Sequence, residues 1–171
     1  MTGVSEPIVR PRMNRMFATA LLLTVALAPA RAEMSPGAAR AIVMPFYKAL
    51  NAEFAGQSAD LIREATAPNW ISCRGNDACN SRDEVVAGIG QRLKSVPDLK
   101  WEIKDVLVAN NQVTVRGEAT GTPSAEFMGT PHSGKSFRVM SIDVHTIEGG
   151  KIVHSYHIED WIGATRQLAA K

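Results

Sequence analysis

The chain has 171 residues, of which 45% are hydrophobic and 21% are charged, and its formal net charge is +2. This composition is typical of a globular domain and excludes a disordered, collagen-like or disulfide-saturated chain. The length excludes a large multidomain protein.

The N-terminal segment is typical of a secretory signal. Three arginines between residues 10 and 15 precede an uncharged run over residues 16–30, which is shorter than the roughly 20 residues of a membrane-spanning helix. The run ends in Ala30-Arg31-Ala32, a small-x-small cleavage pattern. We therefore expect a signal peptide over residues 1–32 and a domain over residues 33–171 that is secreted or periplasmic, without membrane contact after cleavage. An uncleaved membrane anchor is the alternative.

The predicted mature domain is close to neutral. Residues 33–171 carry 15 basic and 16 acidic side chains, so the positive charge of the whole chain belongs to the signal segment. The basic residues are scattered among acidic ones and form no stripe of the kind that binds nucleic acid. We therefore expect no nucleic-acid partner.

The two cysteines of the chain, Cys73 and Cys79, lie in a Gly- and Asn-rich stretch with five residues between them. In an exported protein this spacing favours a disulfide that closes a surface loop. Two reduced thiols are the alternative. Because no histidine lies nearby in the sequence, the pair is a poor zinc site.

Helical patterns occupy the first part of the domain. Ser35 and Pro36 form a helix start, and apolar residues follow at helical spacing as far as Phe54. Pro45 lies inside this pattern and should kink or split the helix. A short helix over residues 58–65, a strand at 70–71 and a helix that starts at the capping box of residues 81–84 and ends before residue 97 complete this part.

The pattern changes to alternation after residue 97. It predicts strands over residues 99–108, 112–122, 137–147 and 151–160, and a final helix over 161–168. Asn110-Asn111 and Gly149-Gly150 mark two hairpin turns. Helices followed by antiparallel strands predict an α+β fold, with the helices on one face of a strongly bent sheet.

One motif is rejected on its context. Residues 129–136 satisfy the P-loop pattern G-x4-G-K-[ST]. A P-loop opens a helix whose N-terminus binds phosphate, whereas residues 137–144 alternate and are β-branched. A strand should therefore follow, and we expect no nucleotide partner.

Several short motifs together resemble a known family. They are Phe127-Met-Gly129, Ser133-Gly-Lys135, Ile142-Asp-Val-His145, Gly150-Lys-Ile152, and Asp160 with Arg166-Gln-Leu168. They resemble the SnoaL-like polyketide cyclase, or ester cyclase, family of the NTF2-like superfamily. The resemblance implies a cone of three N-terminal helices packed on a curved antiparallel sheet around a pocket. It also implies an intramolecular aldol ring closure on a polyketide ester, without a metal or an organic cofactor.

The resemblance places candidate catalytic residues on the last two strands. The family's acid/base Asp falls on His157 and its assisting His falls on Asp143, so the two chemical types are exchanged. A carboxylate beside an imidazole fixes its tautomer and raises its pKa, which leaves the other ring nitrogen to take a substrate proton. Asp160 matches a recurrent family position and is expected to cap the final helix through Gly163.

The turn at Gly149-Gly150 decides whether this pair meets. A three-residue loop with a glycine bulge places Asp143 opposite His157, whereas a two-residue turn shifts the register by one and separates them. In the first register one strand face carries Ser141, Asp143, His145, His157 and Glu159. The alternative for this polar face is an ordinary solvated side of the sheet.

Four aromatic residues would line or close an apolar cavity in such a fold, namely Phe46, Trp70, Trp101 and Trp161. Ser141, His145 and Glu159 are the polar candidates for the same pocket, and ordinary core is the alternative for each aromatic. The leading prediction is an exported acid/base catalyst, of cyclase or isomerase type, that acts on a small carbonyl or ester compound. The alternatives are a non-catalytic module that binds a small molecule and a structural domain that forms a homo-oligomer.

Overall fold

A computed structural model describes residues 33–170. The predicted signal peptide, residues 1–32, lies outside the described residues. Within residues 33–170, no helix has the length and apolar character needed to cross a membrane. The elements are α1 (Pro36–Ala49), the 3-10 helix η1 (Ala52–Gln57), α2 (Ser58–Ala65), β1 (Thr66–Cys73), β2 (Cys79–Ser81), α3 (Arg82–Ser95), β3 (Lys100–Ala109), β4 (Gln112–Gly121), β5 (Phe137–Glu148), β6 (Lys151–Glu159) and α4 (Trp161–Ala169).

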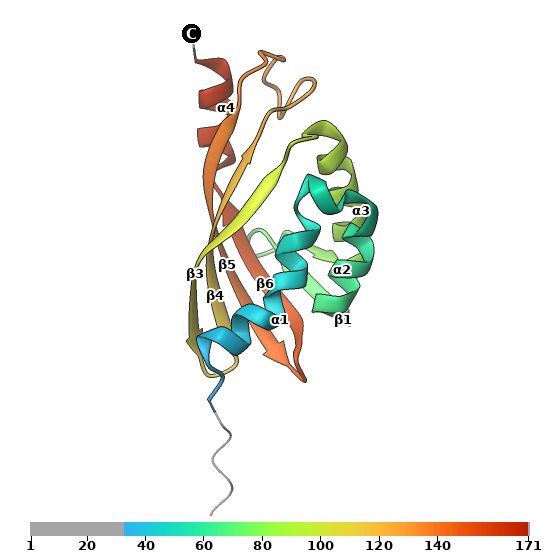
Figure 1. Ribbon diagram of the computed structural model, residues 1–171, viewed down its shortest axis with the longest axis vertical. Coiled ribbons are helices and arrows are strands. Elements are labelled where there is room, and N and C mark those ends of the chain that lie inside the picture. Colours follow the sequence, from blue (N-terminus) through green and yellow to red (C-terminus); the bar gives the residue numbers. More distant parts are fainter. Residues whose placement is uncertain (1–32, 171) are drawn as a thin grey trace, which may run out of the picture. The chain divides into compact units, whose positions relative to one another are not determined.

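Helices α1, α2 and α3 lie on the same face of the sheet, and α4 packs against β5 near one end (Figure 1). The side chain of Ser35 caps α1 by accepting a hydrogen bond from the amide of Ala38 at 3.2 Å. Pro45 does not split this helix, which continues to Ala49 because the buried Val43 and Phe46 anchor it on both sides of the proline. Phe54, expected in the same helix, belongs to the separate η1.

The six strands form one sheet in the order β2-β1-β6-β5-β4-β3. Strands β3 to β6 are antiparallel neighbours, as expected, but β1 pairs with β6 in parallel. The fold class is therefore α+β, as predicted, with a mixed sheet instead of a purely antiparallel one. A parallel pair requires a long crossover connection, so the local pattern of β1 does not reveal its partner.

The β5–β6 hairpin has the predicted register but not the predicted turn. Glu148 pairs with Lys151 across a two-residue turn, in which Gly149 and Gly150 have φ values of 56° and 76°, typical of a type I′ turn. The register then shifts between Thr146 and Ile147. This bulge restores the alignment that the two-residue turn alone would have lost, so Asp143 lies opposite His157.

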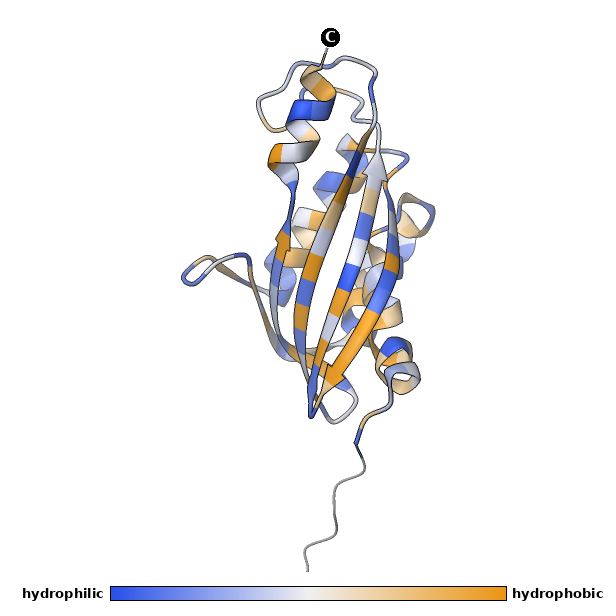
Figure 2. Ribbon diagram, turned by 90° about the vertical axis from the view of Figure 1, so that its left-hand side faces the viewer, coloured by the Kyte–Doolittle hydropathy of each residue, from blue (hydrophilic) through white to orange (hydrophobic). Residues whose placement is uncertain are grey.

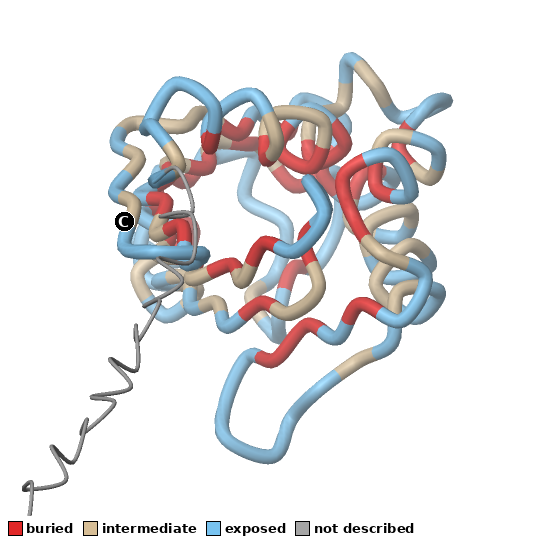
Figure 3. The backbone as a smooth tube through the Cα atoms, turned by 90° about the horizontal axis from the view of Figure 1, so that it is seen from below, coloured by how far each residue is buried: buried red, intermediate tan, exposed pale blue. Residues whose placement is uncertain are grey.

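The polar face of β5 and β6 is the inner face of the domain. Ser141, Asp143 and His145 are buried, whereas Met140 on the opposite face is 53% exposed and Ile158 is 68% exposed. The alternation of hydrophilic and hydrophobic residues along the strands is visible in Figure 2, and Figure 3 shows buried stretches on both the strands and the helices. The interpretation of the polar face as a solvated surface is therefore wrong.

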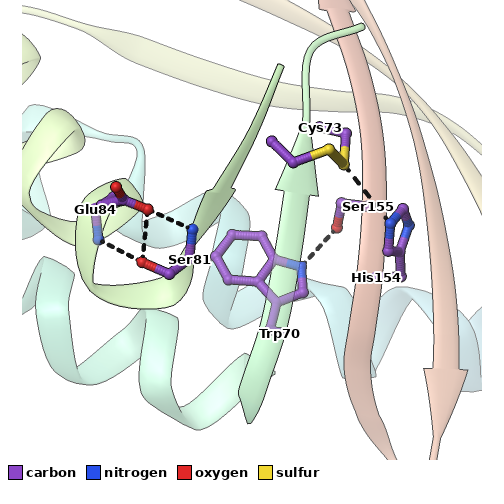
Figure 4. Close-up of a disulfide and its surroundings, with 7 residues drawn as sticks. Trp70, Cys73, Ser81, Glu84, His154 and Ser155 are labelled. Atoms are coloured by element: carbon purple, nitrogen blue, oxygen red, sulfur yellow. Dashed lines mark hydrogen bonds between the residues drawn. A yellow bond between two sulfur atoms is a disulfide. The ribbon is translucent and has the colours of Figure 1, made fainter. Parts of the chain in front are cut away.

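The predicted disulfide is confirmed. Cys73 and Cys79 are bonded and are register partners at the ends of β1 and β2. The sulfur of Cys73 is buried and lies 3.6 Å from Nε2 of His154 on β6 (Figure 4). The disulfide thus closes the β1–β2 connection beside the parallel β1–β6 pair.

The segment with the P-loop pattern leads into β5, which begins at Phe137. Lys135 donates a hydrogen bond to the carbonyl oxygen of Ala170, beyond α4, and His132 is exposed. The element after the pattern is a strand, as predicted, so the helix N-terminus that would bind phosphate is missing at this position.

Candidate functional site

A cavity of about 180 Å³ lies between the helices and the inner face of the sheet. Phe46 and Leu50 at the end of α1 line it, as do Val85, Ile89 and Arg92 on α3. These positions on α3 follow helical spacing, so one side of that helix faces the cavity.

The sheet and the strand ends supply the rest of the cavity wall. Three residues that the sequence places in the pocket, Asp143, His157 and Glu159, line it, and so do Trp101 and Trp161. Asp143, His157 and Glu159 make the sheet side of the wall polar and ionisable, and the two tryptophans add apolar surface.

Three predicted pocket residues do not reach the cavity lining. Trp70, Ser141 and His145 are buried behind the wall, and none of the three is more than 1% exposed. Trp70 and His145 support the site from behind instead, through Ser155, which does line the cavity.

A chain of buried hydrogen bonds runs from Trp70 to Tyr47. Nε1 of Trp70 donates to Oγ of Ser155 at 2.9 Å (Figure 4), and Oγ of Ser155 lies 2.8 Å from Nδ1 of His145. Nε2 of His145 lies 3.1 Å from the hydroxyl of Tyr47. Burial lowers the pKa of His145 to about 3, with a smaller contribution from the charge of His157, so this imidazole is neutral at physiological pH.

The indole donor at one end and the hydrogen bond that Tyr47 donates to Asp143 at the other end together set the direction of these bonds. An indole nitrogen only donates, so Ser155 accepts from Trp70 and its own proton is free to go to Nδ1 of His145. Nδ1 therefore accepts, and Nε2 carries the single N–H of the neutral ring and donates to Tyr47, whose hydroxyl donates to Asp143. Burial, followed by the charge of Asp143 and a hydrogen bond to it, raises the pKa of Tyr47 well above its ordinary value, so Tyr47 keeps the proton that it donates.

Glu159, and not Asp143, holds the His157 ring. Nδ1 of His157 lies 2.8 Å from Oε1 of Glu159, and Nε1 of Trp161 donates to Oε2 of the same carboxylate at 3.0 Å. The two residues on β6 are two positions apart and therefore share one strand face. The expectation that Asp143 orients the imidazole is wrong in this respect, while Nε2 of His157 is left available for a substrate.

The carboxyl group of Asp143 has a pKa close to physiological pH. Burial, followed by the negative charge of Glu159, raises its pKa to about 7. Hydrogen bonds from Tyr47 and Ser141 and the charge of His157 act in the opposite direction, and Oγ of Ser141 lies 3.4 Å from the carboxylate. A group with this pKa can hold or release a proton at physiological pH.

The pKa of His157 is also raised. Burial acts to lower it, but the hydrogen bond to Glu159 and the charges of Glu159 and Asp143 outweigh that effect. Asp143 and His157 influence each other, so their titration belongs to the pair.

The same three residues have the composition of a metal site. One donor atom each from Asp143, His157 and Glu159 lies within 4.8 Å of the other two. Carboxylates and imidazole suit several divalent ions. Glu159 accepts one hydrogen bond on each of its two carboxylate oxygens in this arrangement, so an ion would share these oxygens with the N–H groups of His157 and Trp161.

Sequence reasoning missed Tyr47, Ser155 and Arg92. The signal for Arg92 was present, because Val85, Ile89 and Arg92 follow a spacing of four and three residues and a cation interrupts an apolar helix face. No comparable local signal marks Tyr47 or Ser155. The predicted cap is confirmed: Asp160 accepts a hydrogen bond from the amide of Gly163 at 2.8 Å.

Comparison with known families shows to which class of proteins this chain belongs. The family model of the SnoaL-like polyketide cyclases matches residues 43–168. The chain therefore belongs to the SnoaL-like polyketide cyclase family. No curated protein matches it.

Solved structures with the same fold carry more than one description. A Jannaschia sp. CCS1 protein described as SnoaL-like polyketide cyclase has a TM-score of 0.69 and 19% identity, over 84% of this chain and 99% of that one. IdmH from Streptomyces antibioticus, described as a polyketide cyclase, has a TM-score of 0.66 and 23% identity, over 76% and 97%. AclR from Streptomyces galilaeus, described as a hydroxylase, has a TM-score of 0.67 and 21% identity, over 80% and 84%. These similarities show the fold.

Proposed function

We propose that this protein is an exported, cofactor-independent acid/base catalyst of cyclase or isomerase type that acts on a small carbonyl or ester compound. The observation that carries this proposal is the pairing of Asp143 with His157, two groups with raised pKa values in the wall of a partly apolar cavity. Membership of the SnoaL-like polyketide cyclase family supports it.

The proposed chemistry is enolisation, the first step that ring closure and isomerisation share. Nε2 of His157 takes a proton from the carbon next to the substrate carbonyl, while Glu159 holds the ring through Nδ1. Asp143 in its protonated form donates its proton to the carbonyl oxygen as negative charge develops there. The carbon–hydrogen electron pair becomes the enol double bond, and the former carbonyl electron pair bonds the proton from Asp143.

The order of roles follows from the positions of the two groups. Asp143 is 4% exposed, and its burial favours the neutral acid. His157 is more accessible, and its hydrogen bond to a carboxylate stabilises the imidazolium that forms when it accepts a proton. The exchange of Asp and His relative to the family pattern thus keeps one acid and one base in the same cavity.

Hydrogen–deuterium exchange tests this proposal without knowledge of the natural substrate. In D₂O, the wild-type protein should accelerate exchange of the protons next to the carbonyl of 4-phenylbutan-2-one, followed by NMR. His157→Gln should reduce this rate by about 10²- to 10⁴-fold, and Asp143→Asn should reduce it less. His132→Gln is the matched control, because His132 is exposed on a loop, and it should exchange the probe at the wild-type rate.

The double variant His157→Asp with Asp143→His restores the family arrangement and should recover part of the rate, since residues in contact act non-additively. Dialysis against EDTA should leave the wild-type rate unchanged, because the proposed steps need no metal ion. An equal rate in wild type and His157→Gln would remove His157 from the mechanism. A tightly retained small molecule together with absent exchange would favour the non-catalytic binding module.

A further inference from the structure

The side chain of Arg92 places a positive charge in the lining of the cavity. It lies on α3 within the apolar side of that helix and lines the cavity. Its guanidinium carbon lies 4.5 Å from the ring centroid of Trp161, in a cation–π arrangement. The indole ring attracts the cation, but its N–H is a donor and gives no acceptor for the N–H groups of the guanidinium.

Within residues 33–170, one nitrogen of the Arg92 guanidinium lacks a hydrogen-bond partner. Nη1 is buried from solvent and has no hydrogen-bond partner among residues 33–170. Arg92 takes part in none of the ion pairs of this part of the chain. The charge of Glu159 does act on Arg92, but that carboxylate is already held by His157 and Trp161.

A guanidinium with a buried, unpaired nitrogen is costly unless a ligand completes its hydrogen bonds. Burial lowers the pKa of Arg92, and the nearby positive charge of Arg74 contributes in the same direction. Arg74 lines the same cavity, and among residues 33–170 neither arginine forms an ion pair with an acidic side chain. This arrangement favours a bound anion.

We infer that the cavity binds a small organic carboxylate, with the carboxylate group on Arg92 and the apolar part of the molecule against Phe46, Ile89 and Trp161. A planar guanidinium binds a carboxylate through two parallel N–H···O bonds. The volume of about 180 Å³ is below the range of about 300–1,000 Å³ of pockets for drug-sized ligands, so the ligand is small.

A phosphate is the less suitable anion. Phosphate sites typically use a free helix N-terminus, and the N-terminus of α3 is occupied by the capping box of Ser81 and Glu84. Glu84, Asp143 and Glu159 also line the cavity, and their carboxyl groups would repel a doubly charged phosphate more strongly than a singly charged carboxylate. The inference rests on the proposed function only because it takes this cavity as the substrate site. The ligand that it assigns is a free carboxylic acid, whereas the family resemblance implies an ester.

Binding of three matched probes tests the inference. They are 3-phenylpropanoate, its amide, which has the same shape without the charge, and its methyl ester. By calorimetry, wild type should bind the acid about 10- to 100-fold more tightly than the amide or the ester, the range for a hydrogen-bonded charged group. Arg92→Met should bind the three probes equally, and Arg92→Lys should keep part of the preference, since it retains the charge without the planar fork.

Arg82→Gln is the matched control. Arg82 is a second arginine of α3 with a buried, unpartnered nitrogen, Nε, but it does not line the cavity, so this variant should retain the preference for the acid. Binding of these probes involves no proton transfer, so the inference can stand where the exchange assay fails, and failure of the catalytic proposal is distinguishable from failure of the inference. Absent binding of the acid, equal binding of the three probes by wild type, or a preference for the acid that Arg92→Met keeps in full would overturn the inference. The wild-type comparison decides the matter even where an Arg92 variant does not fold.

Discussion

Asp143 shows how one buried side chain links the chemistry of the site to the stability of the fold. Burial and the charge of Glu159 raise its pKa to about 7, so the folded chain holds a proton that the unfolded chain has released. The contribution of Asp143 to the free energy of unfolding therefore falls as pH rises from about 4 to about 7. His145 has its pKa lowered to about 3, so its contribution to the free energy of unfolding rises between about pH 3 and pH 6.5. The pH dependence of wild-type stability contains both contributions.

Asp143→Asn should isolate the first effect. The amide has nearly the same shape and carries no charge, so the variant should gain stability over wild type at about pH 8, by up to about 4 kcal/mol at 1.36 kcal/mol per pKa unit. The gain should shrink towards about pH 4, where the wild-type carboxyl is also neutral. Urea unfolding at both pH values measures the difference, with Asp60→Asn, an exposed carboxylate, as control. The same stability difference at both pH values would contradict the raised pKa of Asp143.

At the scale of elements, the β5–β6 hairpin and helix α3 place the site. The bulge after the type I′ turn brings Asp143 and His157 into register, and the capping box at Ser81 and Glu84 fixes the start of the helix that carries Arg92. Arg74 and Asn80 line the cavity from the connection between β1 and β2 and from β2 itself. That connection is closed by the disulfide of Cys73 and Cys79.

Replacement of both cysteines by alanine should lower the free energy of unfolding by about 2 kcal/mol, because the disulfide restricts a short loop of the unfolded chain. Urea unfolding of the double variant and of wild type measures this loss. Chemically reduced wild type serves as the control and should behave like the double variant. An oxidised and a reduced wild type of equal stability would show that the disulfide does not stabilise the domain.

For the whole molecule, export and self-association stay predictions. Residues 1–32 have the arginines, the apolar run and the Ala30-Arg31-Ala32 pattern of a signal peptide. The prediction of a homo-oligomer can be checked by measuring the molar mass of the protein in solution by light scattering. On the outer sheet face, Leu107, Tyr156 and Ile158 are each more than half exposed.

Expression of residues 1–171 in a bacterial host should yield an exported protein whose intact mass begins at Glu33, since signal peptidase cleaves after the second small residue of the pattern. A variant with Ala30→Arg and Ala32→Arg removes both small residues and should leave the precursor uncut. An exported wild-type product that still contains residues 17–28 would instead support the membrane anchor.

Much of the fold followed from local patterns. Caps at Ser35 and Ser81 and the alternation after residue 97 predicted the main helices and strands, because capping and side-chain periodicity act over a few residues. The spacing of Cys73 and Cys79 predicted their bond for the same reason. The register that pairs Asp143 with His157 was one of two alternatives, since a turn and a bulge compensate each other in ways that the sequence does not reveal.

Tertiary structure alone decided what these elements enclose. The alternation on β5 separates Ser141, Asp143 and His145 from Met140 and its neighbours, but only packing against the helices makes the polar set the interior. The parallel pairing of β1 with β6 and the contact of His145 with Tyr47 join residues far apart in the sequence. No local pattern specifies such contacts, because their energy depends on groups that meet only once the helices cover the sheet.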